Sequence, residues 1–400
     1  MKKYDLLTPE GTRDLIFDEC AALRSVGEKL RQIYTSHGYS EVITPGLEFF
    51  DVFNNKSRHY SQEVLYKLTD GKGRIMVLRP DSTMPIARLM GTRLRTATLP
   101  LKLFYNQTIY RANPKDSGRD DEFFQSGVEL IGGDVMRSDM EVLSIAAEVM
   151  QSFDAAEQRF EIGDSGFFPL LSSKLGLKEQ ELDDLREYFI SKNYPALDEM
   201  LSRFGGNTDA EALAKMSRLF GGKEVFAEAR KVLPEEAKPI LDRLEKVFDS
   251  LCGLGMSGEV TVDLGFAGKT EDYYTGIVFK GYIEGYGMPV LTGGRYDRLI
   301  ADFGVDTPAT GFAVNENAVA DALLKRSGGM LTPAPDVVIW ADDDNIVNAI
   351  KYCRELISKG LTAEYADLAD RDAAREYAKT RGAKTLRVMT TTDNMEEPLE

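Results

Sequence analysis

A stretch of helical character, residues 165–250, interrupts a chain that otherwise alternates between strands and helices. It is rich in Leu, Glu, Lys and Ala at helical spacing, and the pairs Gly205-Gly206 and Gly221-Gly222 break it into shorter segments. Strand-like sequence precedes this stretch and returns after it. We therefore predict an insertion of helices within a domain that contains both strands and helices.

The segments on both sides of the insertion have the periodicity of strands and helices. Residues 17–37, for example, repeat apolar side chains at helical spacing (Leu23, Val26 and Leu30), and Gly38 is a stop signal. The other expected helices are 82–93, 137–152 and 313–326. The expected strands are 41–45, 62–69, 74–79, 101–110, 122–132, 259–264, 276–284 and 288–292.

A linker, marked by Ser327-Gly328-Gly329 and Pro333-Ala334-Pro335, divides the chain. We expect one domain over residues 1–325 and a small α/β domain over residues 333–400. The second domain should contain strands at 337–340, 362–366 and 384–389 and helices at 345–359 and 370–381. It carries 14 acidic and 9 basic side chains, a net charge of −5, which argues against contact with a nucleic acid such as an anticodon.

Charge and cysteine usage exclude several classes of protein. The net charge of −16 argues against a large polyanionic partner such as tRNA, because phosphate contacts usually need a basic surface. Cys20, Cys252 and Cys353 are too far apart for a metal motif and too few for a disulfide framework. The N-terminus lacks a secretory apolar segment, and no apolar run is long enough to span a membrane. We predict a cytoplasmic protein without a metal site.

Several short segments, in order along the chain, resemble the motifs of histidyl-tRNA synthetase, a class II aminoacyl-tRNA synthetase. They are Pro9-Glu10-Gly11-Thr12-Arg13-Asp14, the motif 1-like Gly38 to Pro45 with Glu48, the motif 2-like Tyr110 to Pro114 and Phe123 to Glu129, and the histidine-specific Asp272 to Gly276 and Gly293 to Asp297. The resemblance implies the α+β fold of class II synthetases. That fold has an antiparallel sheet with flanking helices. In this chain we expect the helical insertion and the small C-terminal α/β domain in addition.

A pocket for histidine must recognise its ring. Neutral imidazole has one N–H donor and one acceptor nitrogen. The resemblance implies that Glu129 accepts the ring N–H, that Tyr273 completes the contacts with the ring and that Tyr274 forms a wall. From the residues alone, Glu129 could equally be a strand residue that faces solvent, and the two tyrosines could belong to the core.

The backbone groups of histidine need complementary partners as well. The resemblance implies that Asp81 and Thr83 accept hydrogen bonds from the α-ammonium, and that Gln125 also contacts the amino acid. Arg111 is expected to help hold the carboxylate. The synthetase usually has Glu at the position of Asp81, so the acceptor is kept with a shorter reach. Alternatively, Asp81 could simply be a favourable charge at a helix N-terminus.

The residues that a synthetase uses for ATP are largely missing. Arg111 of motif 2 is present, but Asn113 replaces the Glu that reads adenine, and the acidic run Asp120-Asp121-Glu122 stands where a basic residue is expected. The histidine-specific Arg aligns with Lys269. The Arg that ends motif 3 aligns with Ala318, which has no side chain to contact phosphate. We therefore expect no catalytic residues and no bound cofactor in this chain.

Loss of the ATP side with retention of the histidine side is typical of the regulatory subunits of ATP phosphoribosyltransferase, and the run from Asp81 to Arg88 resembles that family. The resemblance implies that the chain activates a separate short-form catalytic subunit in the first step of histidine biosynthesis. L-Histidine would be the allosteric feedback inhibitor, and the chain would form a homodimer within a hetero-oligomer. An active histidyl-tRNA synthetase and another synthetase-like paralogue remain the alternatives.

Overall fold

The computed structural model describes residues 4–55, 58–114, 119–256, 258–266, 273–328 and 333–399. The chain divides into two compact units, residues 1–328 and 329–400. This division falls within the stretch that the sequence marks as a linker. Each unit has its own sheet and its own apolar core.

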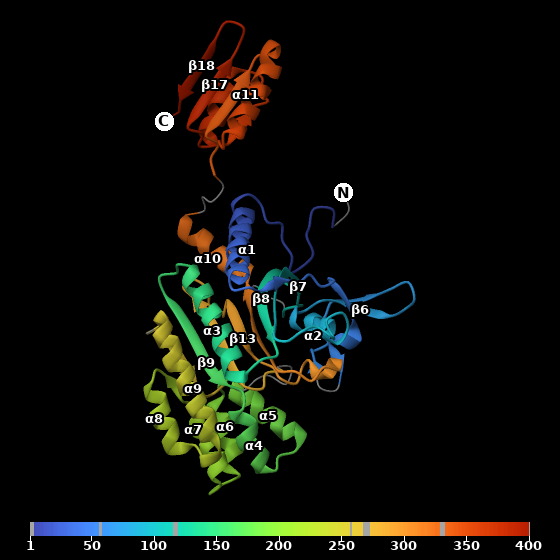
Figure 1. Cartoon of the computed structure of the whole chain (residues 1–400), viewed down its shortest axis with the longest axis vertical. Helices are drawn as coiled ribbons and strands as arrows, with labels where there is room; N and C mark the ends of the chain where they lie inside the picture. Colours follow the sequence, from blue (N-terminus) through green and yellow to red (C-terminus); the bar gives the residue numbers. More distant parts are fainter. Residues whose placement is uncertain are drawn as a thin grey trace. The chain divides into compact units, whose positions relative to one another are not determined.

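A nine-stranded sheet forms the centre of the first unit, counted over the described residues (Figure 1). Its order is β1 (Ser40–Glu41), β7 (Leu101–Tyr110), β8 (Glu122–Ile131), β14 (Ala309–Asn315), β13 (Leu291–Arg295), β12 (Ile277–Ile283), β9 (Gln158–Asp164), β11 (Val260–Asp263) and β10 (Phe220–Gly221). The strands from β7 to β9 in this order all pair antiparallel. The pairs β1–β7 and β9–β11 are parallel, so the predicted antiparallel sheet is mixed near its edges.

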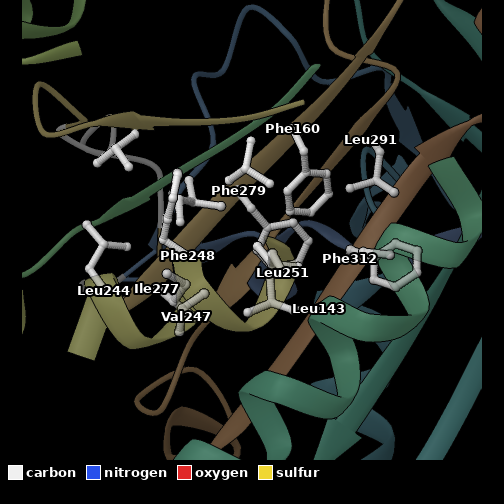
Figure 2. Packing of buried hydrophobic residues seen from close by; sticks show 14 of the residues in the cluster. Leu143, Phe160, Leu244, Val247, Phe248, Leu251, Ile277, Phe279, Leu291 and Phe312 are labelled. Carbon is white, nitrogen blue, oxygen red and sulfur yellow. The ribbon is translucent and has the colours of Figure 1, made fainter. Parts of the chain in front are cut away.

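Helices cover one face of this sheet and bury the main core. They are α1 (Asp18–Ser36), α3 (Val135–Ser152), α9 (Lys238–Leu251) and α10 (Glu316–Ser327). Because side chains alternate along a strand, Ile277 and Phe279 of β12 point toward this core, where they meet Leu143 of α3 and Val247 of α9 (Figure 2). Lys280, one position on, therefore lies on the opposite face.

The predicted helical insertion forms a row of short helices. They are α4 (Phe167–Ser172), α5 (Glu179–Ile190), α6 (Tyr194–Ser202), α7 (Thr208–Met216), α8 (Glu224–Val232) and then α9, with 3₁₀ turns at Ser173–Leu175 and Glu235–Ala237 and a π turn at Cys252–Met256. Figure 1 shows them gathered at one end of β9. The insertion is not purely helical, because its strand β10 pairs with β11 and ties it to the sheet.

Smaller elements flank the motif 1-like segment. They are β2 (Leu47–Phe49), the turn Phe50–Val52, β3 (Asn54–Asn55), β4 (Arg58–His59), β5 (Lys67–Thr69), β6 (Ile75–Leu78), α2 (Thr83–Gly91) and the turn Ala301–Phe303. The strand expected at 62–69 is wrong over its first half, since only Lys67–Thr69 pairs with β6. Helix α2 begins directly after Asp81 and Ser82, which places Asp81 and Thr83 at the start of a helix.

Three strands of the central sheet were not predicted: β10 in the insertion, β14 and β9. The helix expected at 313–326 begins only at Glu316, because residues 313–315 are the end of β14. Asn315 then caps the helix by accepting a hydrogen bond from the Ala318 N–H at 3.1 Å. Strand β9 was missed as well, because it directly precedes the helical stretch.

The second unit is a small α/β domain. Its sheet has the order β16 (Ala363–Tyr365), β15 (Val337–Ala341), β17 (Thr385–Met389) and β18 (Asn394–Pro398), and only β17–β18 is antiparallel. Its helices are α11 (Ile346–Ser358) and α12 (Arg371–Thr380), with a 3₁₀ turn at Asp343–Asn345. Strand β18 was not predicted. None of the described helices in either unit has the length and apolar character that crossing a membrane requires.

Candidate ligand-binding pocket

A cavity of about 940 Å³ lies over the face of the sheet opposite α1, α3 and α10. All seven predicted site residues line it: Asp81, Thr83, Arg111, Gln125, Glu129, Tyr273 and Tyr274. They come from four separate stretches of chain: the start of α2, the residue after β7, the strand β8 and the segment before β12. We call the part of the cavity that these seven residues line the inner compartment. Whether they bind histidine stays a prediction.

Glu129 of β8 is the most buried acid of the inner compartment, with only 2% of its surface exposed. One carboxylate oxygen accepts a hydrogen bond from the Thr83 hydroxyl at 2.8 Å, and the other accepts one from the Tyr296 hydroxyl. Burial raises the pKa of Glu129 to about 8, although these two hydrogen bonds oppose the rise. Glu129 is therefore not the solvent-facing strand residue of the alternative interpretation.

A glycine opposite Glu129 makes room for its carboxylate. Gly311 of β14 is the cross-strand partner of Glu129, and a side chain there would overlap with the Glu129 carboxylate and the Val128 carbonyl. Gly294 of β13 is the cross-strand partner of Gly311 on the other side. It makes room for the ring of Tyr274, since a β-carbon at Gly294 would lie 2.7 Å from that ring. The glycines keep this part of the sheet open to side chains from elsewhere.

Asp81 lies at the start of α2, as one interpretation of the sequence expected, and it also faces the cavity, as the other requires. One of its oxygens accepts the Met84 N–H at 2.9 Å at the start of α2, and the other accepts the Tyr60 hydroxyl. It also lines the inner compartment, where burial raises its pKa. Since each carboxylate oxygen can accept two hydrogen bonds, Asp81 still has acceptor capacity for an ammonium group.

Arg111 and Gln125 bring polar groups that the described residues leave unpaired. The Arg111 Nε donates to the Pro80 carbonyl at 2.6 Å, while its two terminal nitrogens have no hydrogen-bond partner among the described residues. The buried Gln125 Oε1 also lacks a partner there. Buried polar groups are normally satisfied, so these atoms are candidates for contact with a ligand.

Two further tyrosines belong to the inner compartment but were not predicted. Tyr60 and Tyr296 line it and donate to Asp81 and Glu129. The ring of Tyr296 packs edge-on against Tyr273, with centroids 5.4 Å apart. Tyr296 lies in the histidine-specific Gly-Gly-Arg-Tyr-Asp motif, which was the available signal, whereas no motif marks Tyr60.

The neighbouring arginine of that motif has a structural role. Arg295 is 2% exposed, pairs with Asp139 of α3 at 2.9 Å and Asp297 at 2.6 Å, and donates to the Val135 carbonyl at 2.9 Å. These bonds fasten the end of β13 to α3. They thereby fix the position of Tyr296, the next residue.

The residues on the predicted ATP side are occupied by contacts within the chain. The Asn113 amide donates to the Arg111 and Asp120 carbonyls at 3.1 and 3.0 Å, and Asp120 pairs with Arg13. Asp121 accepts a hydrogen bond from Tyr66, and Glu122 accepts one from Tyr110. These three acids are not among the residues that line the cavity.

Two other positions bear on the lost ATP contacts. Ala318 is 2% exposed within α10, so it presents no polar side chain to the cavity. Lys269 and Asp272 lie outside the described residues. Within the described residues, no three His, Cys, Asp or Glu side chains come close enough together to hold a metal ion.

The chain is similar to known proteins over nearly its whole length. Residues 11–319 match the family model of histidyl-tRNA synthetase. An ATP phosphoribosyltransferase regulatory subunit of Clostridium botulinum is 37% identical over 388 residues, which cover 96% of this chain and 91% of that protein. The corresponding subunit of Clostridium kluyveri is 38% identical over 394 residues, 97% of this chain and all of that protein.

A solved structure from Bacillus halodurans is similar as well. It is described as an ATP phosphoribosyltransferase regulatory subunit/histidyl-tRNA synthetase, and it superposes with a TM-score of 0.84 at 29% sequence identity. The match covers 98% of this chain and all of the other. The predicted class II synthetase-like fold is therefore confirmed.

Proposed function

The chain belongs to the family of ATP phosphoribosyltransferase regulatory subunits, and from this membership we propose that its inner compartment binds L-histidine and that the bound histidine inhibits a separate catalytic subunit. Histidine biosynthesis is the pathway that this family regulates. The observation that carries the proposal is the convergence of all seven predicted residues on one cavity.

The chemistry of the inner compartment matches the groups of histidine. Glu129 provides a buried acceptor for the ring N–H, and Asp81 provides an acceptor for the α-ammonium. The unpaired nitrogens of Arg111 suit the α-carboxylate. Tyr273 and Tyr274, with ring centroids 5.3 Å apart, offer aromatic surface to the imidazole. A ligand without these groups would leave buried polar atoms unsatisfied, which supports selectivity for histidine.

The chain itself is proposed not to catalyse a reaction. Aminoacyl-adenylate formation needs cations on the triphosphate, and Ala318 stands where the motif 3 arginine is expected. The amide of Asn113, at the position of the adenine-reading Glu, is held by backbone carbonyls of its own loop. These two positions argue for a binding subunit whose partner carries the active site.

The exposed apolar surface near the motif 1-like segment supports a homodimer within a larger assembly. Ile43 is 81% exposed, and the β2–β6–β5 sheet, whose first strand follows Ile43 in the chain, has exposed apolar side chains as well: Leu47, Phe49, Leu68 and Ile75. Apolar groups of this kind are typical of surfaces that another chain covers. We assign this surface to the second copy of the chain in a dimer that joins the catalytic subunit.

The test is to mix the purified chain with a short-form catalytic subunit of ATP phosphoribosyltransferase and to measure turnover with and without histidine. The proposal expects stimulation by the chain and suppression of that stimulation by histidine. Stimulation that histidine leaves unchanged would contradict the feedback role but not the family.

Histidyl-tRNA synthetase remains the second candidate, because the family model over residues 11–319 is that of the synthetase. Histidine-dependent exchange of pyrophosphate into ATP separates the two functions. The proposed function predicts no exchange above background, whereas an active ligase would show it.

A further inference from the structure

The cavity continues across the sheet beyond the inner compartment. Its far part, which we call the outer compartment, is lined by charged and aromatic side chains from β9, β12, the insertion and the segment after β11: Arg159, Glu161, Lys192, Phe220, Asp263, Phe266, Lys280 and Tyr282. None of these residues was predicted to bind a ligand, and none has a role in the proposed function.

The two compartments are well separated. Strand β8, which carries Glu129, and strand β9, which carries Glu161, are four strand spacings apart in the sheet. At about 4.8 Å per spacing, this corresponds to about 19 Å. A single amino acid bound at Glu129 spans only part of this distance, so the outer compartment is left for a second ligand.

The sheet register brings opposite charges together on the floor of the outer compartment. Lys280 of β12 is the cross-strand partner of Glu161 of β9, and Tyr282 is the partner of Arg159. The Arg159 guanidinium lies 4.5 Å from the ring centroid of Tyr282, and the Lys280 ammonium lies 4.5 Å from that of Phe266. These ring contacts hold both cations over the cavity without neutralising them.

The polar atoms of this floor are poorly satisfied by the chain. Glu161 is only 7% exposed, yet it accepts no hydrogen bond from the described residues, and its ion pair with Arg159 is long, at 3.9 Å. Lys280 has no ion pair or hydrogen bond among the described residues. The neighbouring Lys192 and Asp263 are different, because they pair with each other at 3.0 Å. Lys280 and Glu161 attract each other as charges, but neither makes a hydrogen bond with the described residues, so both keep hydrogen-bonding capacity for a ligand.

The local charge favours an anion. The outer compartment has three cations and two carboxylates. Lys192 and Asp263 neutralise each other, which leaves Arg159 and Lys280 against Glu161, an excess of one positive charge. This excess of cations stands out in a chain whose net charge is −16. Phosphate groups are the usual ligands of such clustered Lys and Arg side chains. A buried carboxylate beside them suits the hydroxyl groups of a sugar, as acidic side chains do for ribose in other folds.

From these features we propose that the outer compartment binds a ribose phosphate, with the phosphate on Lys280 and Arg159 and the sugar hydroxyls on Glu161. The ligand is either a sugar phosphate or the ribose phosphate part of a nucleotide. This site is separate from the histidine site and does not depend on the proposed function.

The test uses isothermal titration calorimetry on the full chain with ribose 5-phosphate, AMP, inorganic phosphate and ribose as ligands. Lys280→Met removes the ammonium and keeps an apolar stem over Phe266. Glu161→Gln removes the negative charge of the acceptor for the sugar hydroxyls. Lys246→Met, at an exposed position of α9, is the matched control for the loss of one positive charge.

The proposal expects ribose 5-phosphate to bind more tightly than phosphate or ribose alone. Lys280→Met should weaken its binding at least tenfold, and Lys246→Met should not change it. Glu161→Gln should weaken binding of ribose 5-phosphate but not of inorganic phosphate. Tighter binding of AMP would assign the site to a nucleotide, and equal binding would assign it to the sugar phosphate alone.

Three results would overturn the proposal. They are no saturable binding of ribose 5-phosphate at millimolar concentration, equal affinity of Lys280→Met and Lys246→Met, or phosphate that binds as tightly as ribose 5-phosphate. Histidine titration of the same variants is the fold control, because the inner compartment should be unaffected by both lysine substitutions. A wild-type chain that binds ribose 5-phosphate but not histidine would contradict the proposed function and would leave this inference standing.

Discussion

Replacing Glu129 by glutamine removes a charge from the inner compartment while keeping the size of the side chain. In the structure, both carboxylate oxygens accept hydrogen bonds from hydroxyl groups, those of Thr83 and Tyr296. Glutamine keeps one of these acceptors and places an NH₂ group at the other. If Glu129 accepts the imidazole N–H, the change removes a charge-assisted hydrogen bond worth about 1.5–3 kcal/mol. The Kd for histidine should then rise about 10- to 150-fold.

The protonation state of Glu129 gives this prediction a second readout. Because burial raises its pKa to about 8, most of these carboxyl groups carry a proton at pH 7. A bound ring N–H favours the carboxylate, so histidine binding should release this proton to the buffer. Free histidine adds about 0.2 proton, since its own imidazole has a pKa near 6.5 and is expected to bind in the neutral form.

Calorimetric titrations in buffers of different ionisation enthalpy measure both the Kd and the number of protons released. At pH 7 the wild-type chain should release roughly one proton more than Glu129→Gln, which should release only the small fraction from free histidine. The release from the wild type should decline as the pH rises through about 8. Glu284→Gln, at an exposed position, is the control for the loss of a carboxylate. Equal affinity and equal proton release in the wild type and Glu129→Gln would refute the reasoning.

Two further substitutions test the surroundings of this site, and a third tests a buried acid at the start of α10, on the helix-covered face of the sheet. Tyr296→Phe removes a hydroxyl donor to Glu129 but keeps the ring against Tyr273, so calorimetry should show about tenfold weaker histidine binding with little change in melting temperature. Gly311→Ala places a methyl group in the space of the Glu129 carboxylate, and urea unfolding should show a loss of about 1–3 kcal/mol together with lost histidine binding. Burial raises the pKa of Glu316 to about 8, above its ordinary value of 4.5. Its contribution to stability is therefore complete below about pH 4.5 and is lost as the pH rises through about 8. Glu316→Gln should reduce the decline of the unfolding free energy between pH 5 and 9, and a decline as steep as that of the wild type would show the assignment to be wrong.

The predicted set of site residues came from motifs whose members are close in sequence. Gln125 and Glu129 lie on one strand, so their spacing alone places them on the same face of β8. Their partners come from distant parts of the chain. Tyr60 donates to Asp81 only because the folded chain brings the two residues together, and no local sequence pattern predicts this hydrogen bond. The position of Tyr296 depends on the ion pair between Arg295 of β13 and Asp139 of α3.

The missed strand β14 has a related physical cause. Strand β14 has Gly311 at the position opposite Glu129, because a larger residue would overlap with the carboxylate. Such a strand lacks the regular apolar alternation by which strands are recognised in a sequence. The glycine that makes space for the Glu129 carboxylate thus makes β14 harder to recognise as a strand from its sequence. The outer compartment was missed for another reason, since Lys280 and Glu161 are distant in sequence and meet only through the sheet register.

The most direct test of the histidine site is a crystal structure of the chain grown with histidine. We predict an imidazole ring between Glu129 and Tyr273, an α-ammonium at Asp81 and a carboxylate at Arg111. Histidine bound elsewhere, or an inner compartment without histidine at a saturating concentration, would contradict the account.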